Sequence, residues 1–188
     1  IVQALIGAVT AVLVALLGWR TLGRRIGITA GFIWALYGTT IYYETELLIP
    51  VIINPLNILA LWMALGRLER QQMSIRAWLP VGLILGVSAI GRPNILITVP
   101  VFLAMIWLAA RNGTVSVPWS RRWPGMAALL IGLLLPILPV TIRNAVVGDD
   151  PVLIAYQGGG NLYLGNNPQA DGITMQMPEV MLDPTLSW

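Results

Sequence analysis

Long apolar runs separated by short polar joints make up most of the chain. Each run carries almost no charge, and about 20 apolar residues in a helix cross the roughly 30 Å hydrocarbon core of a bilayer. The runs are Ile1–Trp19, Ile26–Tyr43, Leu47–Gly66, Ala77–Gly91, Ile95–Ala110 and Gly125–Ile142. The pattern therefore predicts an all-α polytopic membrane protein with about six transmembrane helices.

A segment of different character follows the last run. Pro151–Tyr156 is rich in β-branched and aromatic residues, which favours a strand, and Gly158–Gly160 is typical of a turn. Asn161–Leu164 is then expected to form the second strand of a hairpin. We predict a transmembrane bundle over residues 1–143 and the start of an external, partly β domain over residues 144–188.

Composition supports a membrane protein and excludes several kinds of site. Of the 188 residues, 57% are hydrophobic and only 10% are charged, against about 25% in soluble domains. The absence of Cys and His excludes disulfides, zinc sites and imidazole bases, and the absence of Lys excludes a P-loop. A bound metal would need oxygen ligands, which favours a divalent cation such as Mg²⁺, Mn²⁺ or Ca²⁺. Because Ile1 lies inside an apolar run, we expect a piece of a larger membrane protein that is inactive by itself.

Charge alternates from one joint to the next. One set of joints holds nine Arg and a single acid, Glu69; the Arg are Arg20, Arg24, Arg25, Arg67, Arg70, Arg76, Arg111, Arg121 and Arg122. The other set and the tail hold Arg92 and Arg143 with seven acids, which are Glu44, Glu46, Asp149, Asp150, Asp171, Glu179 and Asp183. Short loops rich in Arg stay cytoplasmic. The Glu44 loop and the C-terminal tail are therefore expected on the outer side of the membrane. Membrane lipids are expected as partners, and nucleic acid is not.

The joint Tyr42–Glu46 is an acidic hinge between the second and third runs. Residues two apart diverge on a helix but point the same way on an extended strand. We expect an extended turn that presents Glu44 and Glu46 together to one ligand, cation or sugar. The alternative is a hydrated turn whose acids only keep it out of the lipid.

Arg92 is the second candidate site residue. The run before it, Ala77–Gly91, has 15 residues, or about 22 Å of helix, which is less than the roughly 30 Å core. Arg92 is therefore expected below the outer surface, where its two-pronged guanidinium suits a phosphate. The alternatives are a salt bridge to Glu44 or Glu46, or a side chain that extends to the interface. For Arg143 an interface anchor near Asp149 and Asp150 is favoured, and the glycines after Gln157 could bind an anion through backbone N–H groups.

Several short motifs together resemble a known family. They are Tyr37-Gly38, the acidic hinge, Gly91-Arg-Pro-Asn94, Thr141-Ile-Arg-Asn144, Gln157-Gly-Gly-Gly-Asn-Leu-Tyr-Leu-Gly-Asn-Asn-Pro168 and Ala170-Asp-Gly172. The chain resembles bacterial GT-C glycosyltransferases of the protein O-mannosyltransferase-like group, multi-spanning enzymes of the plasma membrane. The resemblance implies a polyprenyl-phosphate-linked sugar donor, and it implies substrate-binding roles for Arg92, Asn94, Arg143, Gln157, Asn161 and Asn166. It gives Glu44 and Glu46 a supporting catalytic role and places the main base upstream of Ile1.

The leading function is transfer of a sugar from a polyprenyl-phosphate carrier to an acceptor on the outer face. A carboxylate would deprotonate the acceptor hydroxyl, while an Arg or a metal would stabilise the departing phosphate. The alternative is a transporter or flippase for a lipid-linked or small polar substrate, built on Pro-broken helices. Against the transporter, the charges gather at one face rather than at the midplane. A structural membrane subunit without a site is a third possibility.

Overall fold

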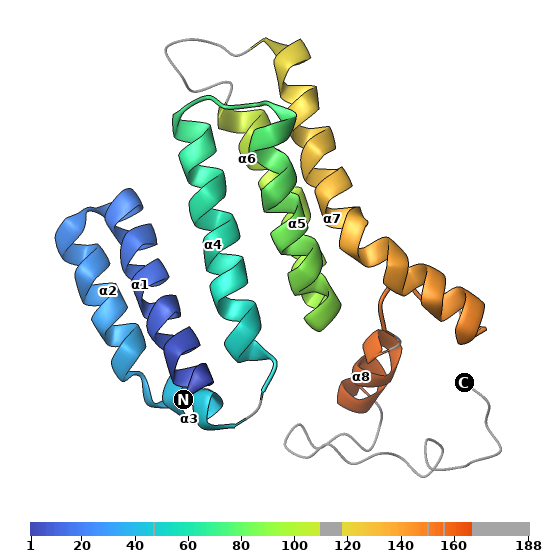
Figure 1. Cartoon of the computed structure of the whole chain (residues 1–188), viewed down its shortest axis with the longest axis horizontal. Coiled ribbons are helices and arrows are strands. Elements are labelled where there is room, and N and C mark those ends of the chain that lie inside the picture. Colours follow the sequence, from blue (N-terminus) through green and yellow to red (C-terminus); the bar gives the residue numbers. More distant parts are fainter. Residues whose placement is uncertain (47, 110–117, 150, 156, 167–188) are drawn as a thin grey trace.

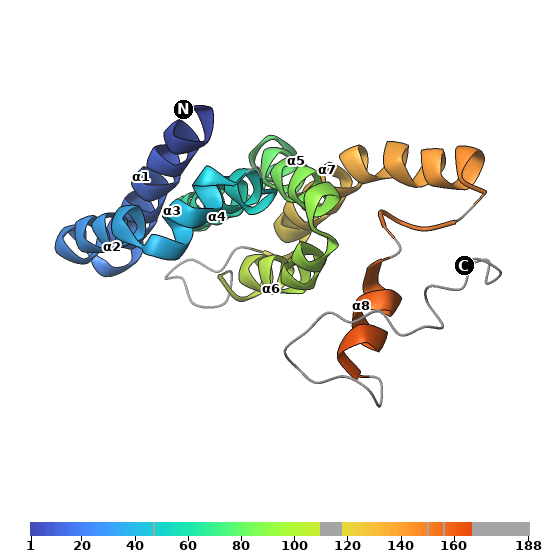
Figure 2. The same cartoon turned by 90° about the horizontal axis from the view of Figure 1, so that it is seen from below.

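The computed structural model describes residues 1–46, 48–109, 118–149, 151–155 and 157–166, and regular structure within them is helical. The elements are α1 (Val2–Leu22), α2 (Arg24–Leu36), α3 (Gly38–Thr45), α4 (Pro50–Glu69), α5 (Ile75–Gly91), η1 (Pro93–Thr98), α6 (Val99–Ala109), α7 (Trp119–Val147) and α8 (Gln157–Asn166). Helices α2, α1, α4, α5 and α7 form a row (Figure 1). Helix α6 lies on one side of that row (Figure 2).

Three helices are long and apolar enough to cross a membrane, namely α1, α4 and the Ser120–Val147 part of α7. The prediction of six crossings is thus confirmed only in part. Helix α5 and the η1–α6 pair are shorter apolar segments. The second apolar run is not one helix, because Tyr37 is extended (φ −71°, ψ 113°) and separates α2 from α3. Gly38 and the two Thr that follow have low helix propensity, which accounts for a break at this position.

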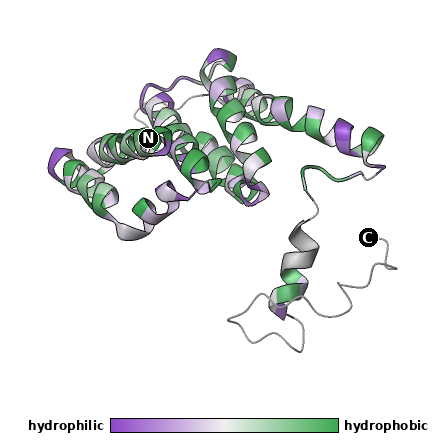
Figure 3. Cartoon of the chain, turned by 60° about the horizontal axis from the view of Figure 1, so that its bottom comes forward, coloured by the Kyte–Doolittle hydropathy of each residue, from purple (hydrophilic) through white to green (hydrophobic). Residues whose placement is uncertain are grey.

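Successive joints lie at opposite ends of the row. The α1–α2 and α4–α5 joints and the start of α7 lie at one end, which we call the arginine end, while α3 and the end of α5 lie at the other (Figure 1). Hydrophobic residues cover most of the helices, and hydrophilic ones gather near helix ends (Figure 3). This arrangement agrees with the predicted alternation of charge. The side of the membrane that each end faces stays a prediction.

Helix α5 is the most buried element of the core. Trp78, Val81 and Leu85 are almost fully buried, and the indole Nε1 of Trp78 donates to the carbonyl of Gln72 at 2.8 Å. Helices α5 and α7 pack backbone against backbone, because a Cβ on Gly82 would overlap the carbonyl oxygen of Leu129. Small residues permit such close approach between membrane helices. The tight contact fixes the position of the end of α5, and so of Arg92.

The predicted hairpin in the tail is wrong where the structure describes it. Residues 151–155 form no strand, since their carbonyls accept from side chains of α7: Thr141 Oγ1 donates to Leu153 at 2.6 Å, and Asn144 Nδ2 donates to Ile154 at 3.1 Å. Residues 161–164 lie in helix α8 rather than in a strand. A short apolar run such as this one fits either structure, so periodicity alone cannot separate them. Tyr156 lies outside the described residues.

Candidate functional site

The position of Arg92 follows from the residues around it. Pro93 disfavours helical backbone in the residue before it, and Arg92 accordingly is extended (φ −145°, ψ 103°). Helix α5 therefore ends at Gly91, and Pro93 begins η1, where its missing N–H costs no helical hydrogen bond. The backbone N–H of Arg92 still donates to Ser88 at 3.0 Å. The backbone of Arg92 is thus held at a fixed break between two helices, and its side chain is exposed there.

A cavity of about 300 Å³ lies beside this break, and we call it the Arg92 cavity. It is lined by Pro50, Ile53, Asn54, Asn57, Arg92, Asn94, Ile95 and Thr98. Among the described residues, the lining contains one cation, three amides and no acid, so N–H donors dominate its polar groups. It also lies beside the N-terminal turn of α4, where the helix dipole favours negative charge. These features suit an anion with several oxygens.

Asn57 is oriented within the Arg92 cavity by a buried partner. The hydroxyl of Ser88, which is fully buried on α5, donates to Oδ1 of Asn57 at 2.6 Å. This hydrogen bond directs the Nδ2 group of Asn57 away from Ser88, so the amide offers donors to the cavity. Arg92 itself forms no ion pair with Glu44 or Glu46 in the described residues. The salt bridge that we gave as an alternative is therefore absent there, and the guanidinium is available for a ligand.

The acidic hinge differs from the extended turn that we expected. Helix α3 continues to Thr45, so Glu44 is helical, and only Glu46 is extended (φ −88°, ψ 143°). The expectation of two carboxylates side by side is thus wrong, because the turn follows the helix rather than containing both acids. Gln3 Nε2 on α1 donates to the carbonyl of Glu46 at 2.9 Å, and the Glu46 side chain is exposed.

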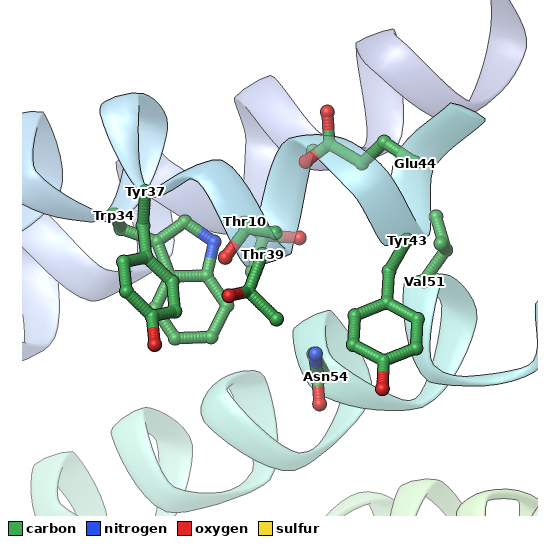
Figure 4. A pocket seen from close by; sticks show the side chains of 10 residues that line it. Thr10, Trp34, Tyr37, Thr39, Tyr43, Glu44, Val51 and Asn54 are labelled. Carbon is green, nitrogen blue, oxygen red and sulfur yellow. The ribbon is translucent and has the colours of Figure 1, made fainter. Parts of the chain in front are cut away.

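Glu44 instead lines a separate cavity of about 200 Å³, which we call the Glu44 cavity. Its lining consists of Gly7, Thr10, Trp34, Tyr37, Thr39, Thr40, Tyr43, Glu44, Val51 and Asn54 (Figure 4). The carboxylate of Glu44 lies against the backbone of α1, since a Cβ on Gly7 would overlap it. A residue larger than Gly at position 7 would displace this carboxylate.

The Glu44 cavity contains a buried donor without a partner. The indole Nε1 of Trp34 is buried and has no hydrogen-bond acceptor among the residues that the structure describes. Figure 4 shows this nitrogen on the side of the ring that faces Thr10 and Thr39. Thr10 is also buried, and its hydroxyl donates to the carbonyl of Ile6 at 2.8 Å. A buried N–H without an acceptor is costly, so an oxygen-bearing ligand would relieve the cost.

Asn54 lines both cavities. It lies on α4, with the Glu44 cavity on the side of α1, α2 and α3 and the Arg92 cavity on the side of α5 and η1. Its amide has one acceptor and two donor hydrogens, so it can serve a ligand on each side. We therefore treat the two cavities as halves of one candidate site.

The other residues predicted for the site lie elsewhere. Arg143 is exposed on α7 and lines neither cavity. Asn166 Nδ2 donates to the carbonyl of Leu162 at 2.8 Å, within α8. The side chains of Gln157 and Asn161 lie outside the described part of the chain. Over the described ranges no three acids form a cluster, and a bound Mg²⁺ or Mn²⁺ stays a prediction for which Glu44 is the carboxylate present.

Sequence reasoning missed Asn54, Asn57 and Trp34. A usable signal was present for the two amides, because polar side chains inside an apolar transmembrane run are costly and mark functional positions. Trp34 is distant in sequence from the joints where interface tryptophans gather, and that position was a second signal. Their convergence with Glu44 and Arg92 depends on tertiary packing.

Comparison with known proteins gives one match. A family model described as dolichyl-phosphate-mannose-protein mannosyltransferase matches residues 1–142. The matched range contains every residue that lines the two cavities, and it ends before the glycine-rich motif at Gln157. No curated protein and no solved structure matches the chain.

Proposed function

Because the chain belongs to the dolichyl-phosphate-mannose-protein mannosyltransferase family, a family of membrane glycosyltransferases, we propose that it serves sugar transfer from a polyprenyl-phosphate carrier to an acceptor on the outer face of the membrane. The observation that carries this proposal is the Arg92 cavity, which is lined by an arginine and three amides and, over the described ranges, by no acid. The carrier phosphate would bind there, and the end of the row with α3 and η1 would face outside.

Arg92 is suited to the phosphate because its guanidinium can donate to two oxygens at once. Asn57 and Asn94 add amide donors at the same cavity. During transfer the bond between the anomeric carbon and the phosphate oxygen breaks, and negative charge grows on the departing phosphate. Donors placed beside this position would stabilise the negative charge that develops in the transition state.

The Glu44 cavity supports a role in binding the sugar or the acceptor. Trp34, Tyr37 and Tyr43 offer ring faces, and Thr39 and Thr40 offer hydroxyls. Glu44 contributes the one carboxylate, which accepts hydrogen bonds from sugar or acceptor hydroxyls and acts in a supporting role. Apolar rings beside a few polar groups are typical of small-ligand sites.

Arg92 variants test this function. Arg92→Lys keeps the charge but loses the two-pronged donor, so it should weaken binding of polyprenyl phosphate. Arg92→Ala should weaken binding more, by roughly 1.5–3 kcal/mol, the usual value for a hydrogen bond to a charged group. Titration of polyprenyl phosphate into the purified protein in nanodiscs, with melting temperature measured beside it, checks the prediction.

Arg143→Ala is the matched control, since Arg143 is exposed and lines neither cavity. It should leave carrier affinity unchanged. If carrier affinity survived Arg92→Ala in a folded protein, the phosphate role of Arg92 would be excluded. If Arg92 were a structural residue, both of its variants would lower the melting temperature and leave affinity per folded molecule as it is.

A further inference from the structure

A third polar cavity lies between α1 and α4 at the arginine end, far along both helices from the candidate site. We call it the arginine cavity. It has a volume of about 160 Å³ and is lined by Arg20, Trp62, Met63, Gly66, Arg67, Arg70 and Gln72. Three guanidinium groups thus meet at one cavity, and a single carboxylate, that of Glu69, lies against one of them. The local charge is strongly positive.

Arg20 is held in place at this cavity. Its Nε donates to both carboxylate oxygens of Glu69 at 3.0 Å, and its Nη1 donates to the carbonyl of Trp62 at 3.2 Å. The guanidinium stacks over the Trp62 ring, 5.0 Å from the centroid. It also covers Gly66, because a Cβ there would lie 2.8 Å from both terminal nitrogens. The side chain is only 20% exposed.

Arg67 is fixed in a similar way, and both arginines keep unused donors. Its Nε donates to the carbonyl of Ala77, and its Nη1 donates to the carbonyl of Met63 at 2.9 Å. Within the described chain, Nη2 of Arg20, Nη2 of Arg67 and the exposed side chain of Arg70 have no acceptor. Arginines that only set the orientation of the protein in the membrane need not gather at one cavity. Here Arg20 and Arg67 are held at the cavity, the exposed Arg70 lies at its rim, and all three keep free N–H groups, which is an arrangement that can bind an oxyanion.

An apolar surface leads away from the arginine cavity along the same helices. Leu16 and Val9 lie 4 and 11 residues before Arg20, which puts all three on one face of α1, and the two apolar side chains are 38% and 55% exposed. On α4, Ile52 lies 18 residues, or five full turns, before Arg70, the residue that caps the C-terminal end of the helix. Between these faces lies a groove of about 380 Å³ whose lining is apolar throughout: Val2, Leu5, Ile6, Val9, Ile52, Pro55 and Leu56.

We propose that the α1–α4 seam binds one membrane phospholipid whose anionic phosphate occupies the arginine cavity. Its acyl chain would run past Leu16 and enter the apolar groove at Val9. The distance fits, because 11 residues of helix span about 16 Å, close to half of the roughly 30 Å hydrocarbon core. Charge complementarity selects an anionic headgroup, and the continuous apolar face selects a lipid over a soluble phosphate. This site is separate from the proposed transferase site and lies at the opposite end of the row.

Arg70 and Arg76 provide a matched pair for the test. Both are exposed arginines at the arginine end, but only Arg70 lines the cavity. The purified protein is placed in nanodiscs that contain phosphatidylcholine with a minor fraction of phosphatidylglycerol, and the phosphatidylglycerol retained after detergent extraction is counted by native mass spectrometry. Arg70→Gln should lower retention about tenfold or more, as expected for one charged hydrogen-bonding group, and Arg76→Gln should not. Melting temperatures of the two variants should be equal.

Two results would overturn the proposal. Equal losses in Arg70→Gln and Arg76→Gln would show diffuse attraction of lipid to a basic surface rather than a site. The second result comes from titrating soluble glycerol phosphate and inorganic phosphate into the same protein. If either bound as tightly as phosphatidylglycerol, the apolar groove would contribute nothing and the occupant would not be a lipid. Selective retention of phosphatidylglycerol that depends on Arg70 would support the proposal.

Discussion

The two halves of the candidate site differ in chemistry although both touch Asn54. In the part of the chain that the structure describes, the Arg92 cavity has a cation and amides but no acid, whereas the Glu44 cavity has a carboxylate, aromatic rings and hydroxyls. Helix α4 lies between them and contributes to both. The difference agrees with the proposed binding of one ligand, in which the phosphate would lie on one side and hydroxyl-bearing groups on the other.

Because Arg92 and Glu44 lie apart, each charged group can still form hydrogen bonds with a ligand. If Arg92 and Glu44 were in contact, each would neutralise the other, and removing either would leave an unpaired charge. In the described chain they form no ion pair, because Glu44 lies against Gly7 of α1 while Arg92 lies at the end of α5. Each therefore has free hydrogen-bonding capacity that a ligand can use.

Glu44→Gln should have the largest effect, and it should separate the two cavities by lowering turnover without changing carrier affinity. The amide has the same shape and fits beside Gly7, but it loses the charge that accepts hydroxyl hydrogen bonds. Turnover should fall on the order of tenfold or more, the effect of losing one charged hydrogen bond, while polyprenyl-phosphate affinity stays the same. Single-turnover sugar transfer and carrier binding, measured on the same preparation, check this prediction.

Glu46→Gln is the control, because Glu46 is exposed and lines neither cavity. It should change turnover less than about twofold, in keeping with a surface substitution. Equal losses in the two variants would show that the acids act together, as the sequence alone suggested. A loss of carrier affinity in Glu44→Gln would remove the division between the cavities.

Asn54→Leu should affect both halves, each to a smaller extent. Leucine has a similar size but no polar atoms, so both cavities lose one neutral hydrogen-bonding group, worth about 0.5–1.5 kcal/mol. Carrier affinity and turnover should each fall about three- to tenfold. Asn57→Leu should lower carrier affinity alone, since Asn57 lines only the Arg92 cavity. If Asn54→Leu changed neither measurement, Asn54 would be a packing residue.

Trp34→Phe should have the smallest effect of these substitutions. It tests whether a ligand accepts a hydrogen bond from the indole N–H in the Glu44 cavity. The substitution keeps an aromatic ring but removes the buried N–H that has no acceptor in the described structure. If a ligand oxygen accepts from this N–H, the KM for the sugar donor should rise about two- to fivefold while the melting temperature stays constant or rises. Trp19→Phe, at the half-exposed Trp19 near the arginine end, serves as the control. An unchanged KM would show that no ligand accepts a hydrogen bond from the Trp34 indole in the Glu44 cavity.

Features that depend on local chain chemistry were predictable from sequence. The three long spans follow from apolar runs, and the break at Arg92 follows from Pro93. The acidic hinge was misjudged because α3 continues to Thr45. The tail was misjudged because Thr141 and Asn144 of α7 satisfy its backbone carbonyls. Contacts of this kind join residues that no sequence window places together.

The composition of the candidate site was predictable only in part. Arg92 and Glu44 were identified from their chemistry and Asn94 from the family resemblance, and in the structure they line two adjoining cavities. Their connection through Asn54 depends on which face of α4 each residue occupies. That face is set by packing against α1 on one side and α5 on the other, and composition does not encode it directly.

Pro55 gives the Glu44 cavity a property that no lining side chain controls. It lies inside α4 and has no N–H, so the helix cannot complete its usual hydrogen bond to the carbonyl of Val51 four residues earlier. Val51 lines the Glu44 cavity, whereas Pro55 lines the apolar groove on another face of α4. The main-chain carbonyl of a residue that lines the Glu44 cavity thus lacks its helical partner because of a residue outside that cavity. Substitution of Val51 by any other residue would keep this free carbonyl. Substitution of Pro55 would restore the N–H and remove the free carbonyl.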